Sequence, residues 1–468
     1  MTQPSNQTAL HWLSLVYAGD ITGTMDRARP AAALQLLEEN PDLIEDDPYL
    51  ACAAGDESVL RRTTAQDPAW VHRAGGPLRL APLVAITHSS LMTQPVHRER
   101  LRACAGFLLE AGASPNQSVG SRWPPASLEA PSETEHLSAL YGAAGRNHDP
   151  ELTKLLLDAG ADPNDGESLY HSLDRPACTR LLLEAGARVT GSNAMYRVLD
   201  LDDVETLRLL LAHGGEANER PLGAPTSDWG SPLLWAIRRR RSPAHIAALL
   251  DAGADPRAST PAGLSAHALA LRFGLTEVAE LLRAAGGGGK PLTPAEAFIA
   301  ACARGDEAQA RSLLAAHPGL IDKLDDAQRR LLPELAADGA RDAVMLMVRL
   351  GWPLEVRGGD WDASALNHAV FRGDARLTRF LLEHGADWRA RHGFGDNAMG
   401  TLSWASLNEP VDDGDWLGCA QALAAHGIPA SSPDPQEADG VLVGDQPYAF
   451  SDEVTDFLLG PDAPQRSR

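Results

Sequence analysis

The sequence predicts an all-α solenoid of stacked helix-turn-helix repeats, roughly 12 units in number. A segment of the form Leu-Leu-acidic-Ala-Gly-Ala, followed by Asp-Pro-Asn or a close variant, returns along the 468 residues. The spacing of the copies averages about 35 residues, which is typical of stacked repeats and not of a compact globule. Within each copy, apolar and charged positions alternate with helical periodicity. Together these observations predict the fold class.

The recurring segment is predicted to be the second helix of each unit. An apolar residue stands four positions before the marker glycine, as Leu108 and Leu156 do. The glycine ends the helix because it adopts the left-handed conformation without steric cost, and the Asp-Pro that follows favours a turn. The marker glycines are Gly112, Gly160, Gly186, Gly214, Gly253, Gly286, Gly351, Gly385 and Gly427, and degenerate copies with proline in this place span 37–41, 60–68 and 314–318.

A first helix is predicted upstream of the second one, because one short helix cannot bury its apolar face alone. Several such helices open behind a Ser or Thr that can cap them, at Thr8, Ser138, Ser231 and Ser364. These stretches resemble the Thr-Pro-Leu-His-x-Ala signature of ankyrin repeats. The glycine-marked helices resemble the second ankyrin helix with its Gly-Ala-Asp-Pro-Asn exit.

The resemblance to ankyrin repeats covers most of the chain and implies both a fold and a function. The implied fold is an ankyrin-type solenoid with short finger loops between its helix pairs. Ankyrin arrays act in general as protein-interaction scaffolds or inhibitors, through finger loops and concave helices. The diverged repeats and short connections look like those of a stand-alone bacterial array.

Glycine, proline and serine clusters predict the domain organisation. An N-terminal array is expected over 7–286, with a Pro/Ser-rich insertion at about 119–135. The glycine run that starts at Gly286 separates it from a C-terminal array over 292–428. A loop and one capping helix follow over 429–460, and 461–468 is predicted to be a disordered tail.

Composition bears on the class of partner. The net charge of -22 would repel phosphate backbones, so nucleic acid is not expected as a ligand. No apolar run approaches the roughly 18 residues of a membrane span, and the first residues lack the cations of a signal peptide. We therefore expect a monomeric cytoplasmic protein that binds another protein. The basic run Arg238–Arg241 is interpreted as complementing a helix C-terminus, with a local anion or acidic-peptide contact as the alternative.

No enzyme chemistry is predicted: we expect no catalytic residue, no cofactor and no metal. Cys104, Cys178 and Cys419 each stand eight residues before a marker glycine, in a mostly apolar column, so they are predicted to be core thiols. The histidines that directly precede marker glycines, His213 and His384 among them, are predicted to cap their helices.

Partner-binding candidates come from the placement of tryptophans. Large rigid aromatic residues in a polar rim are typical of interface hot spots. The candidates are Trp229 and Trp361 in predicted finger loops, Asp228 and Asp360 beside them, Trp388, and Trp123 in the insertion. By contrast, Trp404 is expected to replace a small core residue, and Trp416 to pack beneath a loop.

A second hypothesis comes from another functional class. The stretch over 392–416 departs most from a plain repeat and contains His392, Asp396 and Glu409. These residues could form a groove site of an enzyme or of a small-molecule sensor. A rise in melting temperature with metabolites or metals would favour this alternative.

Overall fold

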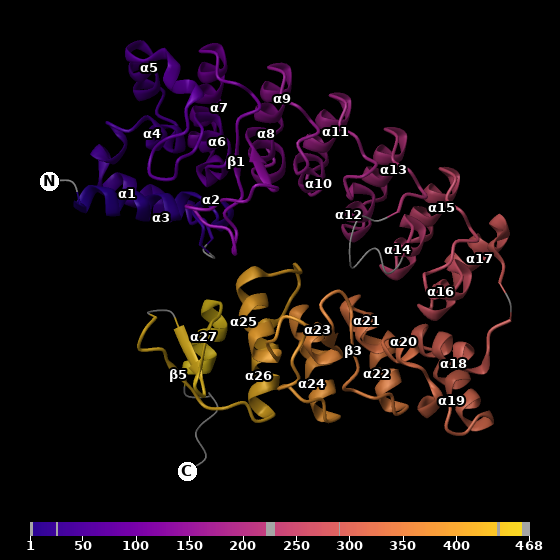
Figure 1. Cartoon of the computed structure of the whole chain (residues 1–468). Coiled ribbons are helices and arrows are strands. Elements are labelled where there is room, and N and C mark those ends of the chain that lie inside the picture. Colours follow the sequence, from indigo (N-terminus) through magenta and orange to yellow (C-terminus); the bar gives the residue numbers. More distant parts are fainter. Residues whose placement is uncertain (1–2, 25–26, 221–229, 290, 438–439, 461–468) are drawn as a thin grey trace. The chain divides into compact units, whose positions relative to one another are not determined.

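The computed structural model describes residues 3–24, 27–220, 230–289, 291–437 and 440–460. Contacts group the chain into two compact units, Met1–Leu222 and Gly223–Arg468, called unit 1 and unit 2 below. Helices dominate both units (Figure 1). None of the described helices combines the length and the apolar character needed to cross a membrane.

Unit 1 begins with helices of varied length and continues as paired short helices. Its α-helices are α1 (Gln3–Val16), α2 (Gly19–Thr22), α3 (Pro30–Glu39), α4 (Pro48–Ala54), α5 (Glu57–Gln66), α6 (Pro82–Thr87), α7 (Pro95–Glu110), α8 (Ala139–Tyr141), α9 (Pro150–Asp158), α10 (Ser168–Ser172), α11 (Pro176–Glu184), α12 (Ala194–Asp200) and α13 (Val204–Ala212). It also has the 3₁₀ turns η1 (Pro41–Ile44), η2 (Pro68–His72) and η3 (Ser90–Thr93), the π turn η4 (Gly142–Arg146), and a hairpin of β1 (Ser118–Gly120) and β2 (His136–Ser138).

Unit 2 continues the paired helices and ends in a small sheet. Its helices are α14 (Pro232–Arg238), α15 (Pro243–Asp251), α16 (Ala266–Arg272), α17 (Thr276–Leu282), α18 (Pro294–Ala303), α19 (Glu307–Ala316), α20 (Asp326–Arg329), α21 (Leu331–Ala337), α22 (Arg341–Arg349), α23 (Ala365–Phe371), α24 (Ala375–Glu383), α25 (Ala398–Asn408), α26 (Trp416–Ala425) and α27 (Asp452–Leu459), with the turns η6 (Arg283–Gly287) and η7 (Ile321–Lys323). Its strands are β3 (Arg357–Gly358), β4 (Ala363–Ser364), β5 (Ser431–Pro433), β6 (Gly440–Val443) and β7 (Gln446–Ala449).

Helices stack in two layers within each unit. First helices contact first helices, as α8 contacts α6 and α23 contacts α21 and α25. Second helices likewise contact second helices, as α9 contacts α7 and α11 and α24 contacts α22 and α26. Each repeat therefore buries its apolar stripe against its neighbours, which confirms an all-α repeat architecture.

The marker glycines end the second helices as predicted. Their φ angles lie between +82° and +97°, the left-handed region that favours glycine. Beyond Gly160, the N–H of Ala161 donates to the carbonyl of Leu156 at 3.0 Å, and Ala113 donates in the same way to Leu108 at 2.9 Å. These bonds satisfy carbonyls that the helix end would otherwise leave without a donor.

The asparagine of Asp-Pro-Asn holds one repeat to the next. Asn116 Oδ1 accepts from the backbone N–H of Asp162 at 2.7 Å, and its Nδ2 donates to the carbonyl of Gly160 at 3.3 Å. Asn164 makes the corresponding bonds, accepting from the N–H of Arg188 at 2.9 Å and donating to Gly186 at 3.4 Å. A polar side chain four residues after one marker glycine thus pairs with the turn of the following repeat.

The predicted helix caps agree with the structure in part. Ser138 Oγ accepts from the N–H of Tyr141 at 2.8 Å, and Ser364 Oγ accepts from that of Asn367 at 3.2 Å. Ser231 precedes α14 without a side-chain capping bond, and Thr8 lies inside α1 instead of at its start. The histidine caps are confirmed: Nδ1–H donates to the carbonyl four residues earlier at 3.0 Å in His213 and at 2.8 Å in His384.

Both sides of the glycine run belong to unit 2, whereas the sequence places a domain boundary there. Helix α16 contacts α18 across the run, and Arg272 Nη2 pairs with Glu296 Oε1 at 2.6 Å. Both of these side chains are largely buried. The glycine-rich composition therefore marks a connection within one unit, and the boundary between the units lies between Leu222 and Gly223.

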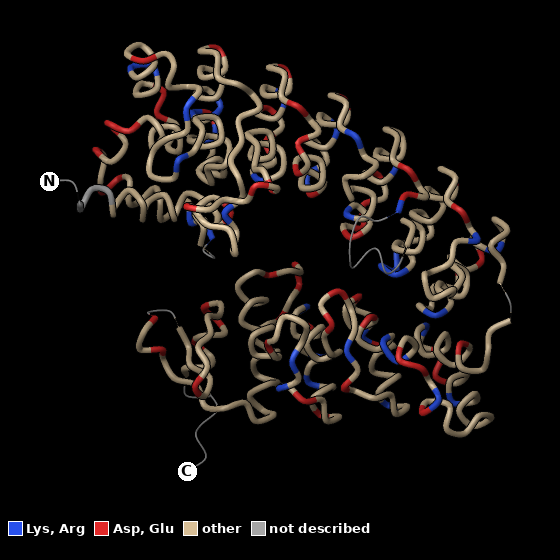
Figure 2. Tube along the Cα trace, in the orientation of Figure 1, with Lys and Arg blue, Asp and Glu red and all other residues tan. Residues whose placement is uncertain are grey.

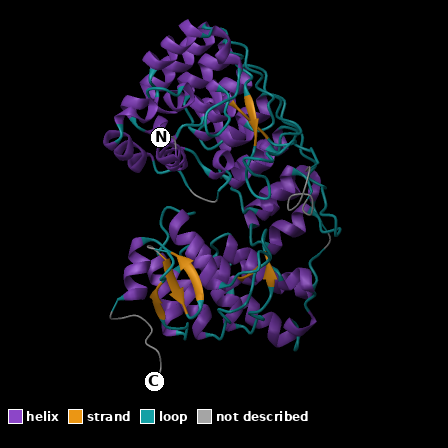
Figure 3. Ribbon diagram, turned by 60° about the vertical axis from the view of Figure 1, so that its left-hand side comes forward, coloured by secondary structure: helices purple, strands orange, loops and turns teal. Residues whose placement is uncertain are grey.

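The C-terminal region contains a sheet that the sequence did not predict. Strands β5, β6 and β7 form an antiparallel sheet (Figure 3), and β5 lies in the stretch predicted to be loop. Val441 and Val443 on β6 are buried, as are Val454 and Leu458 on α27, which contacts β5 and β6. The predicted tail over 461–468 lies outside the described residues.

The predicted core thiols are confirmed as buried. Cys104, Cys178 and Cys419 have no exposed surface. Burial raises the pKa of Cys104 and of Cys419 to about 12, and it also raises the pKa of Cys178. The thiolate, which is the reactive form, is therefore scarce at neutral pH.

We expect these cysteines to resist a thiol reagent in the native protein and to react together once urea unfolds it, because burial blocks both access and ionisation. The measurement is labelling followed by mass spectrometry of the peptides. A Glu133→Cys variant, in the exposed insertion, provides a thiol that should react at once. Rapid native labelling of Cys104, Cys178 or Cys419 would contradict the core assignment of that residue.

Candidate functional site

Trp361 lies in the loop of the β3–β4 hairpin, just before α23. Its half-buried indole meets the ring of His368 edge-on, with centroids 4.7 Å apart. His368 is buried, and its Nε2–H donates to the carbonyl of Gly358 at 3.0 Å. Burial lowers the pKa of His368 to about 4, so the ring is neutral at pH 7. The buried, neutral ring of His368 therefore packs against the inner side of Trp361.

Phe371, at the end of α23, connects Trp361 to the next repeat. Its ring lies 5.6 Å from that of Trp361 and stacks on Trp404 of α25, with centroids 5.4 Å apart and an angle of 9° between the planes. Offset stacking of this kind is a favourable arrangement for aromatic pairs. Two successive first helices thus share one aromatic contact.

Trp404 is 51% exposed, so the prediction that it replaces a core residue is wrong. Helix α25 turns Leu402 and Ser406 toward the interior, and both are buried. Trp404 is two positions from each of these residues, which places it about 200° around the helix, so its side chain faces away from the core. Trp416 is buried as expected, and its Nε1–H donates to the carbonyl of Phe371 at 3.4 Å.

The loop after α24 extends the row of rings in the other direction. His392 is buried and packs edge-on against Trp361 at 4.9 Å, and Phe394 lies 6.1 Å from His392. The N–H of Gly393 donates to the carbonyl of Trp361 at 2.9 Å, which joins the two loops. Phe394 itself is 83% exposed. Burial lowers the pKa of His392, so this ring is also neutral at pH 7.

Five rings therefore form one continuous row, which we call the aromatic surface. It consists of Phe394, His392, Trp361, Phe371 and Trp404. Its members come from two loops that precede first helices and from those first helices, α23 and α25. The sequence singled out Trp361 but missed Phe371, Phe394 and the exposed face of Trp404. A signal for Phe394 was present, because an aromatic residue between two glycines lies in a loop and not in a core helix.

An acidic segment follows the exposed end of α25. Leu407, one turn after Trp404, is 44% exposed. Glu409, Asp412 and Asp413 come next, all exposed, and none of them forms an ion pair with the part of the chain that the structure describes. Acidic and basic residues are interspersed over much of the chain (Figure 2), although residues 30–60 of unit 1 also contain acidic residues and no Lys or Arg. The acidic segment after α25 therefore gives the neighbourhood of Trp404 a local negative charge.

Asp360 was a partner-binding candidate, and the structure places it in an internal ion-pair cluster. Arg238 Nη1 lies 2.7 Å from Asp360 Oδ1, and Arg239 Nη2 lies 2.5 Å from Oδ2. Burial alone would raise the pKa of Asp360, but the two guanidinium groups outweigh it and lower that pKa. Asp360 therefore serves the fold, and the basic run that includes Arg238 does more than complement a helix end.

Trp388 is also a structural residue. Its side chain is 7% exposed, and the guanidinium of Arg389 lies 4.4 Å from the centroid of its ring. Trp388 occupies the position of proline in the Asp-Pro turn, and its carbonyl accepts from the N–H of Ala398 at the start of α25. The packing of this turn against the next helix explains the burial. Trp229 and Asp228 lie outside the described residues.

The residues of the alternative groove site do not come together. His392 and Asp396 precede α25, and Glu409 follows it, so the length of an 11-residue helix, roughly 16 Å, separates them. His392 is buried against Trp361, whereas Asp396 and Glu409 are exposed. Among the described residues, no group of three or more His, Cys, Asp or Glu could hold a metal ion.

A cavity of about 640 Å³ lies within unit 2 beside Arg238. Its charged lining residues are Arg238, Arg272, Arg330, Asp325, Glu334 and Asp360. Cations and anions are balanced in this set, and Arg238 and Arg272 already form ion pairs. The lining therefore carries no net charge that would select a charged ligand.

Comparison with known proteins gives distant likenesses among solved structures. Neither a family model nor a curated protein matches the sequence. Among solved structures, the ankyrin repeat domain of human ASB11 is similar over 53% of this chain and 99% of that domain, with 20% sequence identity and a TM-score of 0.36. The repeat architecture of this chain accordingly rests on its own helix pairs, glycine stops and inter-repeat asparagines.

Proposed function

We propose that the chain is an ankyrin-type repeat protein that binds another protein through the aromatic surface of unit 2. The observation that carries the proposal is the exposure of Phe394 (83%) and Trp404 (51%) at the two ends of a supported row of rings. Neither ring is needed to fill the core. Exposed apolar groups gathered in one place mark interaction sites more often than scattered ones do.

The rings are also held in place before any partner arrives. Trp361 packs against the buried rings of His368 and His392, and Phe371 stacks on Trp404. Large aromatic side chains in fixed positions supply contact area at little cost in conformational entropy, and they dominate the energetics of many interfaces. The geometry fits recognition better than it fits catalysis, and we infer no reaction chemistry for this surface.

The chemistry of the partner follows from the surroundings of Trp404. The acidic segment at Glu409, Asp412 and Asp413 lies next to the apolar pair Trp404 and Leu407. A segment with an apolar anchor followed by Lys or Arg would complement both features. The net charge of -22 would also speed the encounter with such a basic partner.

A peptide selection tests this proposal. Random peptides displayed on phage are selected on the wild-type protein, and the affinities of the enriched peptides are measured by calorimetry. We expect apolar-basic sequences whose affinity falls about thirtyfold or more in Phe394→Ser and in Trp404→Ser, because truncation of a hot-spot ring costs on the order of 2 kcal/mol. Thermal melting of both variants should stay close to that of the wild type.

Leu459→Ser is the matched control, because Leu459 is an exposed apolar residue of α27 outside the aromatic surface. It should bind the selected peptides like the wild type. Peptides that bind Phe394→Ser and Trp404→Ser unchanged would contradict the proposal. A selection that yields no peptide dependent on either ring would contradict it as well.

A further inference from the structure

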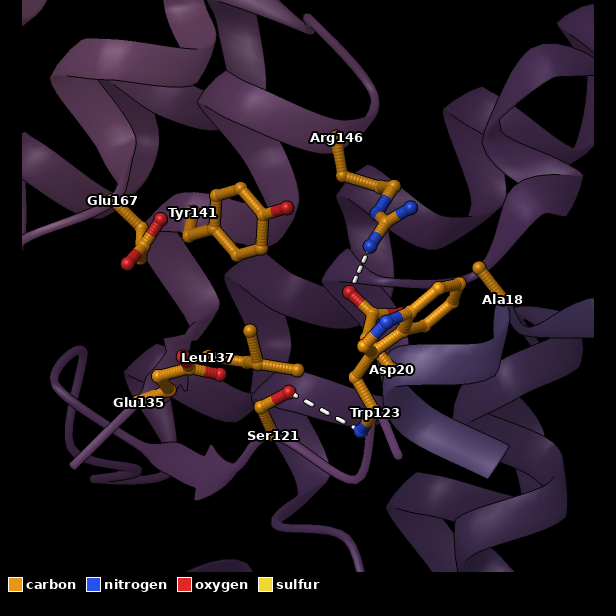
Figure 4. Close-up of a pocket in the computed structure, with 9 residues that line it drawn as sticks. All are labelled: Ala18, Asp20, Ser121, Trp123, Glu135, Leu137, Tyr141, Arg146 and Glu167. Atoms are coloured by element: carbon orange, nitrogen blue, oxygen red, sulfur yellow. Dashed lines mark hydrogen bonds and ion pairs between the residues drawn. The ribbon is translucent and has the colours of Figure 1, made fainter. Parts of the chain in front are cut away.

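A pocket of about 360 Å³ opens in unit 1 where the insertion packs against α2, α8 and η4 (Figure 4). This volume lies within the usual range for ligand sites, about 300–1,000 Å³. Figure 4 shows Trp123 on one side of the pocket and Glu135, Glu167 and Tyr141 toward the other, with Leu137 between them. The site combines aromatic faces, carboxylates and an apolar floor.

The wall that carries Trp123 is anchored firmly. The preceding residue, Arg122, is 2% exposed, and its two terminal nitrogens donate to the carbonyls of Ile21 and Leu78, each at 2.6 Å. Its backbone N–H also donates to the carbonyl of Asp20 at 2.8 Å. Trp123 is nevertheless 47% exposed. A fixed backbone thus presents a large ring to solvent at the edge of a pocket.

The charges that line the pocket are not balanced. Asp20 forms an ion pair with Arg146 inside the pocket lining. Among the described residues, Glu135 forms no ion pair, and the only ion-pair partner of Glu167 is His171, whose Nε2 lies 3.2 Å from Glu167 Oε2. Carboxylates therefore outnumber the single guanidinium of the lining, so a cation is the favoured occupant.

Arg146 indicates how such a cation would be held. Its guanidinium lies 5.8 Å from the centroid of the Tyr141 ring and pairs with the carboxylate of Asp20. The pocket offers the same two kinds of group to a further cation, because the Trp123 ring lies on one side and the carboxylates of Glu135 and Glu167 lie across from it (Figure 4). An arginine side chain suits this pocket better than a lysine side chain, because a planar guanidinium can stack on an aromatic ring and at the same time form two parallel hydrogen bonds with a carboxylate.

We propose that this pocket binds an arginine side chain of a partner protein, between the ring of Trp123 and the carboxylates of Glu135 and Glu167. The aliphatic part of that side chain would lie over Leu137. This site is in unit 1 and shares no residue with the aromatic surface of unit 2. The proposal therefore does not depend on the function proposed above.

Three short alanine-based peptides test the proposal, with arginine, lysine or citrulline at the central position. Citrulline keeps the shape of arginine and lacks its charge. The readout is the indole N–H signal of Trp123 in nitrogen-15 NMR spectra, assigned with a Trp123→Phe variant. We expect saturable shifts with the arginine peptide, weaker binding of the lysine peptide, and at least about tenfold weaker binding of the citrulline peptide.

Variants then distinguish the pocket from nonspecific attraction to an acidic protein. The double variant Glu135→Gln and Glu167→Gln should lower affinity for the arginine peptide about tenfold, whereas Glu133→Gln, at an exposed position of the same insertion, should not. Trp404→Ser should bind this peptide unchanged, so failure here and failure of the aromatic surface are separable. Melting curves of all variants check that the fold is intact.

Three results would overturn the proposal. The first is equal binding of the arginine and citrulline peptides, which would show that charge plays no part. The second is equal loss of affinity in Glu133→Gln and in the double variant, which would show a general effect of net charge. Absence of any shift at the Trp123 indole on addition of the arginine peptide would overturn it as well.

Discussion

Trp235→Ala is expected to destabilise unit 2 by about 3–5 kcal/mol, the usual cost of removing a buried aromatic side chain. Trp235 lies on α14 and is 1% exposed. The guanidinium groups of Arg238 and Arg239 also form cation–π contacts with its ring, at 4.9 and 4.4 Å from the ring centroid. The alanine variant would lose the packing and leave both arginines without the ring on which they rest.

Trp404→Ala is the matched comparison, because Trp404 is a tryptophan on another first helix of the same unit. Half of its surface is exposed, and its main aromatic contact is Phe371. We expect a cost of about 1 kcal/mol, the order of one stacked aromatic pair. Urea unfolding of the two variants, followed by circular dichroism, gives both values. Equal destabilisation by the two substitutions would contradict the exposed position of the Trp404 side chain.

Arg238→Ala is expected to cost about 3–5 kcal/mol, because removal of one partner of a buried ion pair leaves the carboxylate of Glu334 as an uncompensated buried charge. Arg238 is 2% exposed, and its Nη2 lies 2.9 Å from Glu334 Oε2. It also pairs with Asp360 at 2.7 Å. Glu334 in turn accepts from the N–H of Gly359 at 3.0 Å. One guanidinium therefore joins α14, α21 and the loop of the β3–β4 hairpin.

Arg311→Ala is the control for the loss of an ion pair as such. Arg311 pairs with Glu307 on the surface of α19, with both side chains substantially exposed. Exposed pairs of this kind contribute about 0.3–0.5 kcal/mol. The measurement is again urea unfolding, and high salt should weaken the contribution of Arg311 more than that of Arg238. An Arg238 variant as stable as the Arg311 variant would mean that the cluster does not hold unit 2 together.

Local and repeated features of this chain were predictable from its sequence. The marker glycines, the buried column that contains Cys104 and Cys178, and the capping histidines each depend on one helix and its nearest turn. Because the same environment returns in every repeat, several copies point to the same conclusion. The helix pairs and their stacking follow from this periodicity, since no single unit can bury its apolar face alone.

The candidate sites depended on contacts between distant residues. Trp361 and Trp388 look alike in sequence, yet Trp361 is half-buried within a row of rings whose two ends are exposed, and Trp388 is buried beneath Arg389. Asp360 was assigned to a partner because its internal partners, Arg238 and Arg239, lie several repeats earlier. Strand β5 has no alternating apolar pattern and is defined by its pairing with β6.

The physical reason for this division is the range of the interactions involved. Helix stops, caps and apolar periodicity act over a few residues, and the sequence displays them directly. The exposed face of Trp404 depends on the rotation of α25 against its neighbours, and the pocket at Trp123 depends on where Arg122 anchors the insertion. Tertiary packing sets both of these, so only the folded chain shows which aromatic residues are free to meet a partner.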